Sequence, residues 1–268
     1  MEEKQLTVIE HIEELRKRLI IIVVFFMLAV IGSFFLAKPL IKYLQSNGQA
    51  QEITFNAFTV LDPGFVLLKV IIVLAVVLIS PVIMYQLWAF IAPGLKETER
   101  RVTLSYIPFA FLLFLAGAAF AYFVLIPYVM GFMRLLAGDL EIQQTIGINE
   151  YFNFLIQLVI PFGVVFQLPV VMLFLSRLGF LNPDWLAKSR KYAYFALFVL
   201  AAFITPPDLF SHLFTTVPLI LLFELSLFIS RFGYRKFLKA EEEMRLEEIK
   251  AEQQRQIDEV MERMKQDE

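Results

Sequence analysis

The feature that most constrains the fold is a series of apolar segments, several of them long enough to cross a lipid bilayer. A spanning helix needs about 20 mostly apolar residues, because ~30 Å of hydrocarbon is crossed at about 1.5 Å per residue. An open strand in lipid would leave its backbone N–H and C=O groups unpaired, so such segments predict helices. The chain is 59% hydrophobic, above the roughly half that is usual for soluble domains. We therefore expect an all-α integral membrane protein.

Six apolar segments predict six transmembrane helices. They cover residues 19–37, 65–91, 103 onward, 151–175, 192–204 and 213–230. The fifth is short for a bilayer, so it must borrow flanking residues, pair with its neighbour or lie in thinned lipid.

Prolines predict interruptions in these helices, because proline lacks an N–H and clashes with the preceding turn. Pro81 predicts a kink in the second span. Pro127 predicts that the third span turns out of the membrane there. Pro161 and Pro169 predict breaks in the fourth.

The distribution of Lys and Arg predicts the orientation, since short cytoplasmic loops are enriched in basic residues. Alternate loops are rich and poor in them, which places both termini in the cytoplasm. The predicted cytoplasmic residues are Lys4, Arg16, Lys17, Arg18, Lys96, Arg100, Arg101, Arg177, Lys188, Arg190, Lys191, Arg231, Arg235, Lys236 and Lys239. The other side has only Lys38, Lys42 and Arg134.

The chain divides by composition into a six-span domain, residues 1–236, and a charged tail, residues 237–268. The pairs Glu241–Arg245 and Glu259–Arg263 are spaced to support a helix. A thin apolar stripe that includes Ile249 is compatible with a weak coiled-coil seam, but we favour a solvated helix. The N-terminus has no short apolar core with a cleavage site, so it does not resemble a removable signal peptide.

Composition weakens several function classes. A net charge of −2 argues against a nucleic-acid partner, whose binding requires concentrated basic residues. The absence of cysteine excludes disulfides and thiolate metal sites, and His11 and His212 are too far apart in sequence to favour a histidine site. The sequence contains no recognised catalytic or nucleotide-binding motif. We expect no cofactor and no metal, and enzyme is the weakest class.

Three polar residues lie at membrane depth or at its edge. Glu224 lies inside the sixth span, where an ionisable group is costly and usually has a partner or a functional role; reaching the interface or Arg231 is the simpler alternative. Gln167 precedes Pro169, and a local structural hydrogen bond is the favoured interpretation. Asp208, in TPPDLF, is interpreted first as a helix cap.

Two acidic residues stand out at the predicted cytoplasmic surface. Glu14 lies four residues before Arg18, and Glu99 lies beside Arg100 and Arg101, so both can form ordinary surface pairs. Both also place a carboxylate on a surface that is otherwise rich in Lys and Arg. This arrangement suits a cationic ligand that approaches from the cytoplasm.

The same regions resemble a known family. HIEELRKRL (11–19) and SPVIMYQLWAFIAPGLKETERR (80–101) are similar to the two signature regions of TatC, the multi-spanning receptor of the twin-arginine protein translocase. FAYFVLIP (120–127), FGVVFQLPV (162–170) and TPPDLFSH (205–212) match further blocks in the family's order. The resemblance extends from residue 10 to residue 231.

This resemblance implies binding and transport in a bacterial cytoplasmic membrane. The family captures signal peptides with two consecutive arginines and exports folded proteins with the proton-motive force. It works in an oligomeric complex with single-span subunits of the TatA and TatB type, which dock at the short fifth and sixth spans.

The resemblance also implies functional residues. The arginine-recognising acids of the family fall on Glu14 and Glu99, and a guanidinium offers a carboxylate a planar fork that lysine lacks. The other matching recognition positions are Arg16, Phe90, Pro93, Leu95 and Arg101. Tyr122 and Asp208 match extracytoplasmic positions. Gln167 stands where many members have glutamate, and a glutamine cannot titrate.

Two other functions remain open from the residues alone. An ion- or proton-coupled transporter of small solutes could use Glu224 and Gln167 along a midplane path. A structural membrane scaffold would need only partner binding. The acidic residues gather at the surface instead of the midplane, which favours peptide capture.

Overall fold

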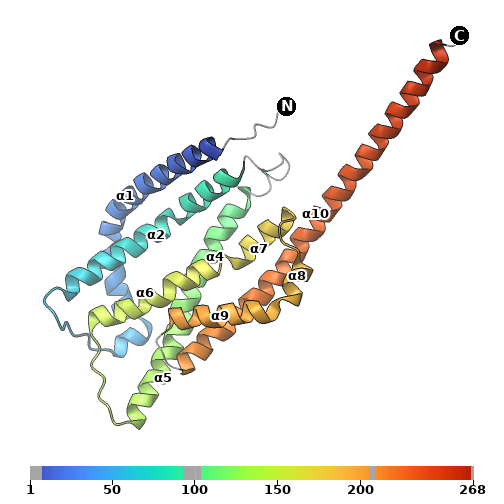
Figure 1. Ribbon diagram of the computed structural model, residues 1–268. Helices are drawn as coiled ribbons and strands as arrows, with labels where there is room; N and C mark the ends of the chain where they lie inside the picture. Colours follow the sequence, from blue (N-terminus) through green and yellow to red (C-terminus); the bar gives the residue numbers. More distant parts are fainter. Residues whose placement is uncertain (1–7, 93–99, 101–103, 206–208, 267–268) are drawn as a thin grey trace. The chain divides into compact units, whose positions relative to one another are not determined.

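The computed structural model describes residues 8–92, 100, 104–205 and 209–266 (Figure 1). The elements are α1 (Val8–Ser46), a 3₁₀ turn η1 (Gly48–Glu52), α2 (Asp62–Ile91), α4 (Tyr106–Phe120), a π turn η3 (Ala121–Leu125), α5 (Ile126–Asp139), α6 (Ile148–Val165), α7 (Leu168–Arg177), α8 (Pro183–Lys188), α9 (Arg190–Ile204) and α10 (Leu209–Gln266). Across these described residues the only β pairing is a bridge between Asn56 and Gly147. The predicted all-α fold is confirmed.

Within the described residues, five helical stretches are long and apolar enough to cross a membrane. They are Ile12–Ser46, Asp62–Ile91, Tyr106–Asp139, Ile148–Arg177 and Leu209–Asp258, and they contain the first four predicted spans and the sixth. The predicted fifth span corresponds to α9, which has 15 residues and therefore covers only about 22 Å. A total of six spans and the cytoplasmic placement of both termini stay predictions.

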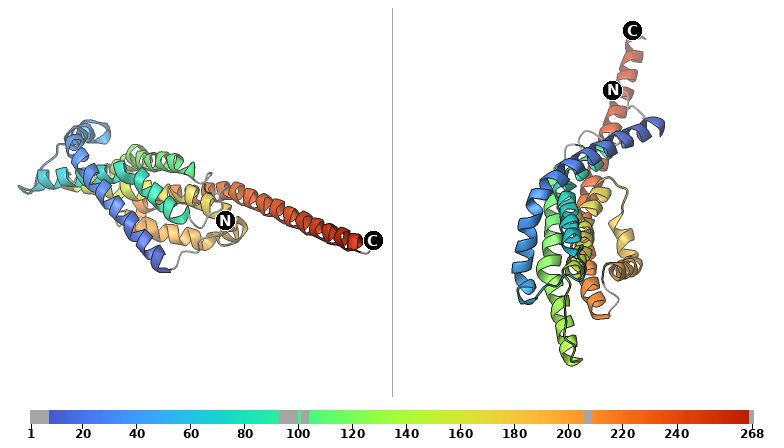
Figure 2. Two further views of the ribbon diagram at one scale, coloured as in Figure 1. Left: turned by 90° about the horizontal axis from the view of Figure 1, so that it is seen from above. Right: turned by 90° about the vertical axis from the view of Figure 1, so that its left-hand side faces the viewer.

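The chain forms two compact units. The first contains Met1–Leu168 and Tyr194–Leu221, and the second contains Pro169–Ala193 and Leu222–Glu268. In the first unit α1 packs along α2, and α6 packs against both α2 and α4. Figure 1 and the right-hand view of Figure 2 both place α1 and α2 side by side.

Small residues allow α4 and α6 to approach closely. A Cβ at Gly117 of α4 would lie 2.6 Å from the carbonyl oxygen of Phe162 in α6. A Cβ at Gly163 would lie 2.7 Å from the ring of Phe114, which is itself buried. Glycine at both positions therefore lets an aromatic side chain and a backbone pack across one crossing point, as is common between membrane helices.

Polar contacts join the start of α2 to the start of α6. Lys69 Nζ donates to Asn149 Oδ1 and to Asn153 Oδ1, each at 2.6 Å. Asp62, at the start of α2, is buried and accepts from the backbone N–H groups of Phe58 and Thr59 at 2.8 and 2.9 Å. Asp62 thus satisfies two backbone donors of the loop that precedes α2.

One of the proline predictions is wrong, and another stays a prediction. The third span continues as helix α5 through Pro127 to Asp139, and its exit from the membrane near Pro127 stays a prediction. Pro127 is the second residue of α5 and directly follows the π turn η3, and such a turn locally changes the helical hydrogen bonding that a proline would otherwise disrupt. Pro161 lies within α6, which runs through it to Val165.

The break in the fourth span is confirmed at Pro169. Phe166 and Gln167 form a turn between α6 and α7, and Pro169 is the second residue of α7. Pro81 lies inside α2, which continues as a helix on both sides of it. Proline thus interrupts the helix at one of the four positions.

In the second unit α7 packs on the facing part of α10. A Cβ at Gly233 of α10 would lie 2.8 Å from the carbonyl oxygen of Leu173 in α7. Gly179, at φ +77°, follows the end of α7 and lies against the ring of Phe237. The left-handed conformation favours glycine there. Beyond this contact α10 remains helical to Gln266, with exposed side chains at 238–258.

Candidate functional site

Glu14 lies on α1 just before the first apolar stretch, and its carboxylate is held by Arg18 one turn later. Arg18 Nε donates to Glu14 Oε1 at 3.2 Å, and Arg18 Nη2 also donates to this oxygen. The side chains of Arg18 and Glu14 are only 20% and 22% exposed. The pair predicted from the four-residue spacing is therefore confirmed, and it is more buried than a typical surface pair.

Arg18 also contacts the last turns of α2. Its Nη2 donates to the carbonyl oxygen of Ala89 at 2.7 Å, and its Nη1 donates to Gln86 Oε1 at 3.3 Å. Within a helix the Ala89 carbonyl would accept from the N–H four residues on, but that residue is Pro93, which has no N–H. Arg18 supplies a donor to this carbonyl and so joins α1 to the end of α2.

The neighbouring acid differs from Glu14 in its surroundings. Glu13 Oε1 pairs with Lys17 Nζ at 3.1 Å, with side chains 62% and 70% exposed. Exposed pairs of this kind contribute about 0–1 kcal/mol. Glu13 therefore offers a matched control for Glu14: an exposed carboxylate one position away that pairs with Lys17 of the same helix.

The other predicted recognition residues fall into two groups. Arg16 is exposed on α1, and Phe90 is partly buried in the last turn of α2. Pro93, Leu95, Glu99 and Arg101 lie outside the described residues, as does Asp208. The structure thus describes Glu14, Arg16 and Phe90, the part of the predicted site that lies on α1 and α2.

Gln167 has a structural contact, as its favoured interpretation required. Its Nε2 donates to the carbonyl oxygen of Ala110 in α4 at 3.1 Å, and to that of Gly163 at 3.5 Å. The stronger bond joins two helices, whereas the sequence suggested a local bond. Tyr122 lies in the π turn η3, partly buried, with its ring edge-on to that of Phe123 at 4.9 Å.

Glu224 forms a two-point ion pair within the second unit. Arg190 Nε donates to Glu224 Oε1 at 2.7 Å, and Arg190 Nη2 donates to Oε2 at 2.9 Å. Sequence reasoning offered the membrane interface or Arg231 as the simpler alternative to a functional role. It missed Arg190 because the two residues are 34 positions apart and belong to different helices.

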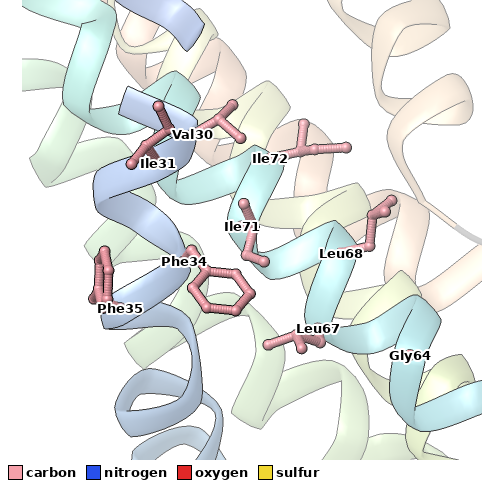
Figure 3. Close-up of a pocket in the computed structure, with 9 residues that line it drawn as sticks. All are labelled: Val30, Ile31, Phe34, Phe35, Gly64, Leu67, Leu68, Ile71 and Ile72. Carbon is pink, nitrogen blue, oxygen red and sulfur yellow. The ribbon is translucent and has the colours of Figure 1, made fainter. Parts of the chain in front are cut away.

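An apolar groove of about 700 Å³ lies between α1 and α2 (Figure 3). Phe34 of α1 points toward Leu67 and Ile71 of α2, whereas Phe35 lies on the side of α1 away from α2. Phe34 is 20 positions beyond Glu14, which is about 30 Å along a helix, so the groove is remote from Glu14. It offers no polar group to orient a charged ligand. Among the described residues no three acidic or histidine side chains cluster as a metal site would require.

Comparisons with known proteins show the family to which the chain belongs. The family model described as Sec-independent protein translocase protein (TatC) matches residues 10–218. The translocase protein TatCy of Bacillus subtilis is 55% identical over 240 residues, covering 90% of this chain and 94% of its own. TatC of Halalkalibacterium halodurans is 52% identical over 253 residues, covering 94% of this chain and all of its own.

A solved structure is also similar. The crystal structure of the twin arginine translocase receptor TatC superimposes with a TM-score of 0.74 at 33% identity, covering 84% of this chain and 99% of that one. These matches give no support to the alternative of a small-solute transporter. The chain belongs to the TatC family of Sec-independent protein translocase proteins.

Proposed function

We propose that this chain is the receptor and core subunit of a twin-arginine translocase. It binds signal peptides that carry two consecutive arginines and takes part in exporting folded proteins across a bacterial cytoplasmic membrane, driven by the proton-motive force. Its role is binding and transport without catalysis. Both termini lie in the cytoplasm, and residues 237–268 form a tail beyond the spanning domain.

The state of the Glu14 carboxylate carries this proposal. Its Oε1 accepts from Arg18, and no described residue donates to its Oε2. A partly buried carboxylate with one oxygen still available can accept a charge-assisted hydrogen bond, about twice as strong as a neutral one. A peptide arginine supplies such a donor, and Glu99 is proposed to accept the second arginine.

The same reasoning extends to the neighbouring positions. Phe90 lies on the turn of α2 that Arg18 contacts through Ala89, where it can pack against the apolar flank of the peptide. Pro93, Leu95, Arg16 and Arg101 are proposed to shape the remainder of this surface. Tyr122 and Asp208 are proposed to act on the opposite side of the membrane.

Single-span subunits of the TatA and TatB type are the proposed partners, in an oligomeric complex. Helix α9 exposes large apolar side chains, including Phe195 at 68% and Phe203 at 79%. Helix α9 is also short, so the bilayer would have to thin around it. A partner helix that covers its apolar side chains would reduce this need. This supports docking at α9 and the start of α10.

The test compares two peptides and two carboxylates. A fluorescent signal peptide with two arginines, and its version with two lysines, are titrated against the full chain in lipid nanodiscs. We expect the arginine form to bind more tightly, and Glu14→Gln to weaken its binding by roughly tenfold or more, the effect of losing one charge-assisted bond. Glu13→Gln removes the same charge from the exposed neighbour and should change the affinity by less than about twofold.

The opposite result is clear. If the wild-type chain binds both peptides equally, the surface recognises charge alone and the receptor proposal is wrong. If it prefers arginine but Glu13→Gln and Glu14→Gln behave alike, the receptor stands and Glu14 is not its arginine-binding residue.

A further inference from the structure

Arg18 makes four hydrogen bonds to three acceptors that lie on two helices. Its guanidinium donates twice to Glu14 Oε1 on α1, and to Ala89 O and Gln86 Oε1 on α2. Gln86 is 8% exposed and Ala89 is 9% exposed, so the acceptors on α2 are buried. A guanidinium has five N–H donors in a rigid plane, whereas an ammonium is a compact point charge. Only arginine can serve this set of acceptors together.

The contact fixes the direction of the Glu14 carboxylate. Arg18 uses Oε1 for both of its bonds, and Oε2 accepts none from the described residues. A carboxylate has about four acceptor sites, so it can serve two guanidinium groups at once. An exposed glutamate would have to lose its side-chain freedom on binding, whereas Glu14 is already restrained.

The contact also fixes the helix that carries Phe90. The Ala89 carbonyl cannot accept the usual N–H bond from four residues later, because that residue is Pro93. Arg18 bonds that carbonyl at 2.7 Å and so couples the position of Glu14 to the last turn of α2.

We propose that Arg18 is a positioning residue for arginine recognition: it holds Glu14 through Oε1 and directs Oε2 to an arginine of the signal peptide. This inference rests on the proposed receptor function. Arg18 itself does not contact the peptide arginine. Its effect is on selectivity, because a carboxylate held in one direction favours a planar guanidinium over the compact point charge of an ammonium.

The experiment uses Arg18→Gln, with Lys17→Gln as its matched control. Both substitutions remove one positive charge from the same turn of α1, and both break a bond to a glutamate four residues earlier. Only Arg18→Gln also removes the hydrogen bonds to Gln86 and Ala89 of α2. The readout is the ratio of the dissociation constants of the twin-lysine and twin-arginine peptides in nanodiscs.

We expect Arg18→Gln to lower this ratio by about tenfold, equivalent to the loss of one charge-assisted bond. Lys17→Gln should leave the ratio within about twofold. Arg18→Lys keeps the charge but cannot reach all the acceptors, so it should not restore the ratio. If Arg18→Gln fails to fold, as judged by its thermal transition, Arg18→Lys gives the deciding ratio.

A double substitution separates positioning from simple structural support. If Arg18 acts through Glu14, adding Arg18→Gln to Glu14→Gln lowers the ratio no further. The proposal is overturned if Arg18→Gln keeps the wild-type ratio, if it tightens binding of the arginine peptide, or if its effect adds fully to that of Glu14→Gln. A wild-type chain without any preference for arginine would instead overturn the receptor function itself.

Discussion

At the residue scale, the charged side chains near the apolar spans are held by specific partners. Glu14 is paired with Arg18, Glu224 with Arg190, and Lys69 with two asparagine oxygens. Ionisable groups near lipid are costly unless they are compensated. The Glu224–Arg190 pair and the bonds of Lys69 join two helices, and Arg18 reaches a second helix through Gln86 and Ala89.

The pair between Arg190 and Glu224 leads to a prediction of stability. Its side chains are 41% and 35% exposed, so solvent screening limits the coupling to about 1 kcal/mol. We expect Glu224→Gln and Arg190→Gln each to lower the thermal unfolding temperature in detergent. The double substitution should cost less than the sum of the two, because each single change already removes the same ion pair.

The control for this pair lies on the same helix. Glu248 is fully on the exposed part of α10, and Glu248→Gln should leave the unfolding temperature unchanged. Strictly additive effects of the two single substitutions would show that the ion pair contributes nothing to stability.

Sequence reasoning reached these contacts only where they were local. The bond between Glu14 and Arg18 follows from a four-residue spacing on one helix. The contact of Arg18 with Ala89 had one signal in the sequence: Pro93 follows Ala89 at the position where an N–H donor is required. The bond between Arg190 and Glu224 had none, because it depends on how two distant helices pack.

At the element scale, the close crossing of α4 and α6 depends on two glycines, which have no Cβ atom. Gly117 and Gly163 leave space for Phe162 O and for the Phe114 ring. The bond from Gln167 to Ala110 O lies along the same pair of helices. Since membrane helices gain little from the hydrophobic effect in lipid, such close packing supplies much of their association.

A single methyl group at this crossing should therefore be costly. Gly117→Ala places a Cβ 2.6 Å from Phe162 O, and overpacking of this kind costs about 1–3 kcal/mol. Gly131→Ala is the matched control, because a Cβ at this α5 position meets nothing within 4 Å. It should be neutral or stabilise the helix by up to about 1 kcal/mol. Thermal unfolding followed by circular dichroism in detergent compares the two, and equal unfolding temperatures would contradict the close packing.

The long spans could be predicted from the sequence, because length and apolarity are sufficient to identify them. The effect of each proline could not be predicted, because it depends on the position of the proline within a helix. Pro169 lies beside a real break, whereas Pro127 occupies the second position of α5 after a π turn that changes the local hydrogen bonding. A sequence shows the proline but not whether the preceding turn has already adapted to it.

At the scale of the whole molecule, the number of crossings decides where the tail lies. Four long spans precede α8, so α8 is expected on the same side as the N-terminus. If α9 crosses, α10 returns the tail to that side; if α9 does not cross, α10 carries the tail to the opposite side. The basic residues near Arg190 and Arg231 predict that α9 crosses, although its 15 residues are short for a bilayer.

The chain has no cysteine, so single cysteines can report the topology without background. Three exposed positions are suitable: Gln143 between α5 and α6, Asp184 in α8, and Gln253 in the tail. In intact bacterial cells, a membrane-impermeant maleimide should label Gln143→Cys alone. Asp184→Cys and Gln253→Cys should react only after permeabilisation, and the cysteine-free parent should never react. Labelling of Gln253→Cys in intact cells, with Asp184→Cys still protected, would mean that α9 does not cross and that the chain has five spans with an external tail.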